Sequence, residues 1–113
     1  MASDMADVVF HALADATRRD IVRRAIDAEE GVAELAGHYA MSFAAVQKHV
    51  AVLEGAGLVT KERRGRERLV RTDIDTVQRA QALLDGIEEL WRARVDRIDN
   101  LLAAENRTSG DKR

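Results

Sequence analysis

The 113-residue chain carries 18 Lys and Arg against 20 Asp and Glu, and 46% of its residues are apolar. It has no cysteine, which excludes disulfides, thiolate metal ligands and thiol redox chemistry. The length predicts one domain over residues 1–105 with a flexible polar tail at 106–113, and the lack of a signal peptide or long apolar run predicts a cytoplasmic protein without membrane contact.

Two helices open the predicted fold. The first covers residues 4–13, with Met5, Val8, Val9 and Leu13 on one side. The second begins after a cap at Asp15, and its buried stripe is expected to contain Ile21, Val22, Ala25 and Ile26. Its basic face contains Arg18, Arg19, Arg23 and Arg24. We interpret that face as solvated and paired with acids of the same helix, with a phosphate contact as the alternative.

A helix-turn-helix follows. A loop through Glu30-Gly31 leads to a helix over 32–38, and residues 39–41 form the turn before a helix capped by Ser42. Val46, Val50 and Leu53 recur at i, i+4 and i+7, which predicts the core face of this helix. Gly57 is expected to end it in a left-handed conformation. This spacing is typical of a module whose second helix enters the DNA major groove.

The opposite face of the helix from Ser42 has the chemistry to read bases. It carries Ala44, Gln47, Lys48 and Ala51. Small residues allow close approach to a duplex, glutamine pairs with an adenine edge, and lysine reaches guanine or phosphate. Residues 42–72 contain seven Lys and Arg and three Glu, which gives a net charge of +4. The local charge therefore suits a phosphate backbone although the whole chain has a formal net charge of −2.

A hairpin is expected next, with extended segments at 58–63 and 67–72 joined through Arg64-Gly65-Arg66. The glycine supplies a positive φ for the turn. We interpret this hairpin as a wing whose arginines contact phosphates or the minor groove, and a merely charged, soluble hairpin is the alternative. The predicted DNA contacts are Ser42, Phe43, Ala44, Gln47, Lys48 and His49 on the helix and Arg63, Arg64 and Arg66 on the wing.

A long helix over 75–105 completes the chain. One heptad row consists of Leu84, Trp91 and Ile98. A second row consists of Ala80, Ile87 and Leu101 and is interrupted at Arg94, and the rows are widened by Leu83, Leu90, Val95 and Leu102. One small domain does not cover so long an apolar stripe, which favours a helix–helix dimer interface. Trp91 could instead line an effector pocket, although a tryptophan in a heptad row is more typical of a dimer core.

The chain resembles the ArsR-type (arsenical-resistance-repressor) winged-helix regulators over nearly its whole length. The resemblance is carried by residues 13–22, 32–36 and 41–59. It implies a homodimer through the first and last helices that presents two recognition helices to a palindromic operator and represses by occluding a promoter. The interface residues assigned on this basis are Val9, Leu83, Leu84, Ile87, Trp91, Val95, Ile98 and Leu101.

Two departures from the family pattern are visible. Ala16 replaces the usual proline after the aspartate, which removes only a preset helix start. Metal-sensing members carry a cysteine pair before the recognition helix or ligands across the last helices. Here there is no cysteine and no histidine on the last helix. The chain thus resembles the branch that does not sense metals, and no metal or other cofactor is predicted.

Other functions are less well supported by the residues. His11, His38 and His49 lie on different predicted elements, which does not favour a metal site. For His49, a phosphate contact and packing beside the wing both remain open. Ser42 has no nearby general base, there is no Gly-rich phosphate loop, and the carboxylates lie on exposed helix faces, so no enzyme is predicted. The alternatives kept open are a metal-responsive repressor and a winged helix whose basic wing binds an acidic protein. The sequence does not indicate the operator or any inducer.

Overall fold

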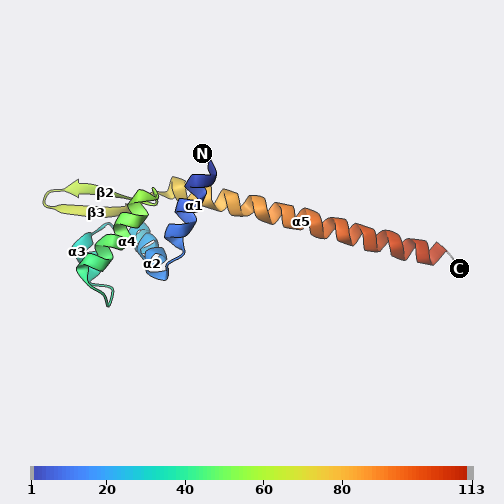
Figure 1. The fold of residues 1–113 in the computed structure, drawn as a ribbon, viewed down its shortest axis with the longest axis horizontal. Coiled ribbons are helices and arrows are strands. Elements are labelled where there is room, and N and C mark those ends of the chain that lie inside the picture. The colour runs from blue at the N-terminus through green and yellow to red at the C-terminus, as the bar shows by residue number, and fades with distance from the viewer. Residues whose placement is uncertain (1, 112–113) are drawn as a thin grey trace. The chain divides into compact units, whose positions relative to one another are not determined.

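The computed structural model describes the backbone of residues 2–111 and the side chains of residues 5–107. The chain divides into two units, residues 1–80 and residues 81–113. The helices are α1 (Ala2–Leu13), α2 (Ala16–Asp27), α3 (Val32–Ala36), α4 (Phe43–Gly55) and α5 (Ile74–Asp111), and the strands are β1 (Glu30–Gly31), β2 (Val59–Arg64) and β3 (Glu67–Thr72). In the first unit the four short helices lie together beside the hairpin of β2 and β3 (Figure 1). The predicted class, mainly helical with a hairpin wing, is confirmed.

The core of the first unit is formed by the helices α1, α2, α3 and α4 together with the base of the sheet. Its largest fully buried side chains are Ile21, Leu35, Leu53, Leu58, Val46, Val50, Val59 and Val70. Burying each contributes about 1.5 to 3 kcal/mol of transfer free energy. The expectation that Ile26 is buried is wrong, because it lies at the edge of the apolar stripe in the last turn of α2 and is 57% exposed.

The sheet has three antiparallel strands in the order β1-β3-β2. The loop expected at Glu30-Gly31 is instead the short strand β1, which pairs with Val70 and Leu69. A strand of two residues has no sequence periodicity and is defined by its partner. In the hairpin, Arg64 belongs to β2 and pairs with Glu67, so the turn is the two residues Gly65-Arg66 rather than the predicted three. Gly65 has φ +61°, as the first central position of a type II′ turn requires.

Helix α5 is longer than the sequence pattern predicts. It begins at Ile74, where the N–H of Asp75 donates to Oδ1 of Asp73 at 3.0 Å. It continues to Asp111, beyond the predicted end at Glu105, because residues 103–109 include no proline or glycine to stop it. Lys112 and Arg113 lie outside the described residues, and the flexibility of the tail stays a prediction. No helix within residues 2–111 is both long and apolar enough to cross a membrane.

Candidate nucleic-acid interface

Both ends of α4 are fixed by local hydrogen bonds. Oγ of Ser42 accepts from the N–H of Ala45 at 3.1 Å, which confirms the predicted cap. At the other end the N–H of Gly57 donates to the carbonyl of Glu54 and the N–H of Leu58 to that of Leu53, each at 3.0 Å. These two bonds form a Schellman motif, and Gly57 has φ +76°. The helix therefore has a defined start, length and exit direction.

The two faces of α4 separate as the sequence predicts. Val46, Val50 and Leu53 are 0% exposed. The opposite face exposes Ala44, Gln47, Lys48 and Ala51. At the N-terminal end Ser42 is also exposed, as is Phe43 at 47%. The apolar contacts of the first face fix the rotation of the helix about its axis. The polar side chains of the second are thereby held away from the core, where a duplex can reach them.

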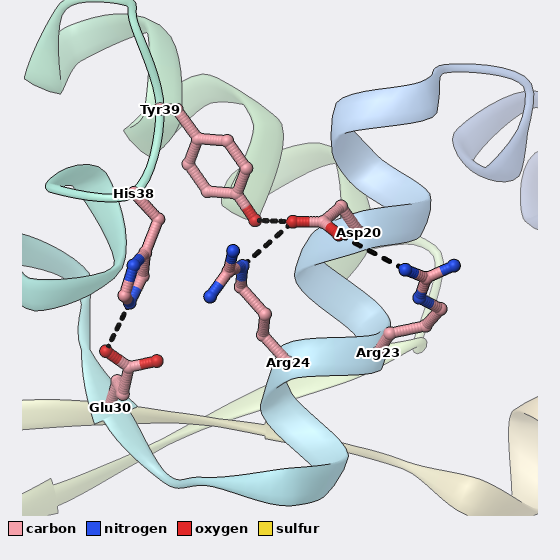
Figure 2. A network of polar contacts seen from close by, with 6 residues as sticks. All are labelled: Asp20, Arg23, Arg24, Glu30, His38 and Tyr39. Carbon is pink, nitrogen blue, oxygen red and sulfur yellow. Dashed lines mark hydrogen bonds and ion pairs between the residues drawn. The ribbon is translucent and has the colours of Figure 1, made fainter.

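The turn before α4 is held by a polar network around Asp20 (Figure 2). The hydroxyl of Tyr39 donates to Oδ2 of Asp20 at 2.7 Å, and Nε of Arg24 donates to the same oxygen at 2.8 Å. The guanidinium of Arg24 also lies 5.7 Å from the centre of the Tyr39 ring, within cation–π range. Arg23 pairs with the second carboxylate oxygen of Asp20 at 3.6 Å. The contacts of Tyr39 with Asp20 and Arg24 therefore hold the turn against α2.

These contacts change the acidity of the groups involved. The bonds from Tyr39 and Arg24 lower the pKa of the Asp20 carboxyl, since both favour its charged form. Burial, and then the bond to Asp20, raise the pKa of Tyr39 to about 12. A further contact across the same region joins Nε2 of His38 to Oε2 of Glu30, in β1, at 2.8 Å.

The arginines of α2 behave in two ways. Arg23 and Arg24 pair with Asp20 on their own helix, as predicted. Arg18 and Arg19 instead donate to backbone carbonyls at the C-terminal end of α1. Sequence reasoning missed this role, although helix ends always carry carbonyls without intrahelical partners and a cation on the next helix is suited to them.

His49 is not part of the exposed reading face. It is half-buried, and its Nδ1 lies 3.4 Å from Nη1 of Arg18 on α2. On an α-helix it lies about 100° around the axis from Lys48. Its polar contact is with Arg18 of α2. The packing beside the wing and the phosphate contact expected from the sequence both stay predictions.

The wing has two chemically different faces, because alternate residues of a strand point to opposite sides. One face carries Arg64 and Arg71, and both contact Glu29. Nε of Arg71 donates to Oε1 of Glu29 at 2.8 Å, and Arg64 lies 3.6 Å from Oε2 of the same carboxylate. Arg71 also pairs with Glu62 at 3.4 Å. The pKa of Arg71 is raised chiefly by its bond to Glu29. The charge of this face is largely neutralised.

The other face of the wing is turned toward α4, since Lys61 on it pairs with Glu54 of that helix at 3.6 Å. Arg63 and Arg68 stand directly opposite each other on this face. Like charges in that position repel, and within residues 5–107 neither has a carboxylate partner within 4.0 Å. Arg68 was not among the predicted DNA contacts. We find in this pair an uncompensated cationic site on the side of the wing that carries Lys61.

A groove of about 430 Å³ lies between the wing and α4. Its lining includes Gln47 from α4, Lys61, Arg66 and Arg68 from the wing, and the start of α3. Gln47, the predicted base-reading residue, therefore borders one surface with Arg66 and Arg68 of the wing, and Glu34 and Glu67 line the same groove. Within the described residues no three His, Cys, Asp or Glu side chains lie close enough together to hold a metal ion.

A second candidate surface lies on α5. Large apolar side chains repeat along it with high exposure, among them Leu84 at 49%, Ile87 at 64% and Trp91 at 60%. Leu83, Ile98 and Leu101 are likewise exposed, and Val95 is half-buried. The assignment of Val9 to a dimer surface is wrong, because it is buried in the core of the first unit at 6% exposure. Among the side chains of α1 that the structure describes, the exposed large apolar ones are Met5 and Val8.

Comparisons with known proteins give a consistent result. The chain is 39% identical over 71 residues to YuzN, an uncharacterised HTH-type transcriptional regulator of Bacillus subtilis strain 168, and the match spans 57% of this chain and 77% of that protein. The crystal structure of an ArsR family transcriptional regulator is 30% identical, with a TM-score of 0.74, over 80% of this chain and 93% of the other.

A solution structure from Mycobacterium bovis shows the same fold at lower identity. It is the homodimeric winged helix-turn-helix DNA-binding domain of a possible ArsR-family regulator. It is 24% identical with a TM-score of 0.63, over 76% of this chain and 80% of the other. No profile of a known protein family matches the chain. These relatives are regulators of transcription.

Proposed function

Because the chain belongs to the ArsR family of winged helix-turn-helix transcriptional regulators, we propose that it is a repressor that binds a palindromic operator as a homodimer. The observation that carries the proposal is the exposed face of α4, which carries Gln47 and Lys48. Gln47 also borders the groove that Lys61, Arg66 and Arg68 of the wing line. Repression follows from occupancy, because a dimer seated on a promoter blocks the polymerase. Such a protein works where the chromosome lies, so we place it in the cytoplasm.

Reading and affinity come from different residues in this proposal. Gln47 reads a base edge in the major groove, and Lys48 is shared between guanine and phosphate. Ala44 and Ala51 have no side-chain hydrogen-bonding group, so they permit close approach or touch a thymine methyl group. The arginines on the α4 side of the wing contact phosphates, and supply affinity that does not depend on sequence. Arg66 borders the same groove and belongs with them.

The Gln47→Ala variant tests the assignment of base reading. A preferred duplex is first selected with the wild type from a random-sequence library, and affinities for it and for an unrelated duplex are measured at fixed salt. Gln47→Ala should lose about 1 to 3 kcal/mol on the selected duplex and less on the other. Gln78→Ala, at an exposed glutamine of α5, is the matched control and should change neither. A Gln47→Ala protein with the wild-type affinity ratio would place reading elsewhere.

The homodimer is proposed from the exposed apolar rows of α5 together with Met5 and Val8 of α1. A helix with so many exposed leucines, isoleucines and a tryptophan is stabilised when a second copy covers them. The related domain from Mycobacterium bovis is homodimeric. Leu84→Asp should give monomers that bind the selected duplex weakly. Ala82→Asp adds the same charge at an exposed position outside the heptad rows and should stay dimeric. Light scattering that finds a monomeric wild type at micromolar concentration would refute the dimer.

We also place the chain in the branch of the family that does not sense metals. The chain has no cysteine, so no thiolate site can form. Its three histidines are in α1, in the turn before α4 and in α4. Within residues 5–107 the polar partners of the last two, Glu30 and Arg18, are side chains of the protein itself.

A further inference from the structure

The guanidinium of Arg18 connects three helices. Its Nε donates to the carbonyl of Ala12 at 2.6 Å and its Nη2 to the carbonyl of His11 at 3.1 Å, both at the end of α1. Its Nη1 lies 3.4 Å from Nδ1 of His49, on α4. The residue itself belongs to the first turn of α2, where its backbone N–H donates to the cap Asp15 at 3.0 Å. All three nitrogens of one planar group are therefore engaged.

The chemistry of this contact sets the direction of a hydrogen bond across it. A guanidinium has only donors, so Nη1 of Arg18 donates and Nδ1 of His49 accepts. Through this bond His49 connects α4 to the same group that holds the end of α1. His49 follows Gln47 and Lys48 directly, so its position constrains the helix where these side chains leave it.

We propose that Arg18 is a positioning residue for DNA reading, which sets α4 relative to α1 through His49. The proposal rests on the function proposed above. The apolar contacts of Val46, Val50 and Leu53 fix which face of α4 is buried, but apolar contacts have no preferred direction. The Arg18–His49 hydrogen bond is directional. It limits small rotations of α4 that would move the Gln47 amide out of hydrogen-bonding range of a base.

Arg19 is a matched control for this role. Its Nη1 donates to the carbonyl of Leu13 at 2.7 Å, so it too satisfies the end of α1 from α2. Within the described side chains its hydrogen bond is to α1 and not to α4. Replacing either arginine removes bonds to α1, and only replacing Arg18 removes the bond to His49.

The first test compares Arg18→Ala, Arg18→Lys, His49→Ala and Arg19→Ala. The ratio of affinities for the selected and the unrelated duplex is measured at several salt concentrations, with thermal unfolding as a check on folding. Losing one directional hydrogen bond should lower the ratio about five- to tenfold in Arg18→Ala and His49→Ala. The slope of affinity against salt should not change. Arg19→Ala should keep the wild-type ratio. Arg18→Lys keeps the positive charge but loses the planar set of guanidinium donors, so its ratio should stay below that of the wild type.

The double variant Arg18→Ala/His49→Ala adds a coupling measurement. If the two residues act through their contact, the double variant should lose no more than Arg18→Ala alone. Additive losses would overturn the proposal. So would an Arg18→Ala protein with the ratio of Arg19→Ala, or one that weakens both duplexes and flattens the salt slope, which would make Arg18 a phosphate contact. Should Arg18→Ala not fold, His49→Ala decides the question.

A spectroscopic measurement separates this proposal from the proposed function. Long-range ¹H–¹⁵N spectra of the wild type should show Nδ1 of His49 as a hydrogen-bond acceptor, and its signal should move in Arg18→Ala but not in Arg19→Ala. A His49 protonated on Nδ1 would overturn the contact even if the protein binds DNA. A wild type that prefers no duplex would instead refute the proposed function.

Discussion

Replacing Arg68 with alanine should weaken DNA binding without destabilising the fold. Arg68 stands directly opposite Arg63 in the hairpin, and like charges at that spacing are unfavourable by a few tenths of a kcal/mol. Removing one of them should leave the free energy of unfolding unchanged or slightly higher. A residue kept only for stability would give the opposite result. The pair is stabilised instead when a phosphate lies against it.

The magnitude follows from counterion release. Each lost phosphate contact lowers the slope of log affinity against log salt by about 0.9, so a dimer that loses two should lose about 1.8. Between 50 and 200 mM salt, affinity should then fall about twelvefold less for Arg68→Ala than for the wild type. Fluorescence anisotropy with a labelled duplex, repeated at several salt concentrations, measures the slope. The loss should be similar on the selected and the unrelated duplex.

Arg64→Ala is the matched control. The sequence predicts a DNA contact for Arg64, but its side chain is on the neutralised face of the wing, so we propose that it does not contact phosphate. Its partner Glu29 lies 3.6 Å away on the surface, and an exposed ion pair of this kind contributes about 0 to 1 kcal/mol. Arg64→Ala should therefore leave the salt slope almost unchanged and slightly lower the stability. Equal slopes for Arg68→Ala and the wild type, or a larger change in Arg64→Ala, would refute the assignment of the two faces.

Two further outcomes are expected. Tyr39→Phe should lower the free energy of unfolding by about 1 kcal/mol near neutral pH. The deficit should shrink as pH falls below 3.8, because the pKa of Asp20 is lowered in the folded state and protonation of its carboxylate removes the stability that this shift provides. It should shrink again as pH rises from 10.0 to about 12, because the pKa of Tyr39 is raised in the folded state and ionisation of its hydroxyl removes the corresponding stability. Urea unfolding measures it, and a deficit that is constant over that range would contradict the role of the network. Zinc should leave operator affinity unchanged in anisotropy titrations, and a tenfold shift would instead support a metal-responsive repressor.

The recognition helix was predictable because several local signals agree there. The cap Ser42, the apolar spacing through Val46, Val50 and Leu53 and the stop at Gly57 each depend on residues close in sequence. All three are confirmed. The exposed positions then follow from helix geometry alone. Their contact with bases is not a local property, and it stays a prediction.

The chemistry of the wing was not predictable, because it depends on register. A three-residue turn through Arg64-Gly65-Arg66 would set Arg63 opposite Glu67, as an ion pair. The two-residue turn sets Arg63 opposite Arg68 instead. A shift by one residue changes every cross-strand partner. The sequence contains the glycine that makes either turn possible, but it does not show which residues close the turn.

Contacts between distant elements were equally hidden. The burial of Val9 depends on the faces that α2 and α4 present to α1, and the roles of Arg18 and His49 depend on an approach between residues 31 positions apart. Amphipathic periodicity indicates which face of a helix is buried in general. It does not distinguish a core inside the chain from a surface covered by a second copy. Val9 was therefore assigned to the wrong one of these two.

The ion pairs explain how a chain with a formal net charge of −2 can present a cationic surface to DNA. Between residues 42 and 72, Glu54 and Glu62 contact Lys61 and Arg71, while Glu29 from outside this range binds Arg71 and Arg64. These acids neutralise cations at the base and on one face of the wing. Among the described side chains of that range, the cations that have no carboxylate within 4.0 Å are Lys48, Arg63, Arg66 and Arg68. Acids elsewhere in the chain have little influence beyond a screening length of about 8 Å. The distribution of ion pairs, more than the total charge, therefore determines which side chains a phosphate backbone meets.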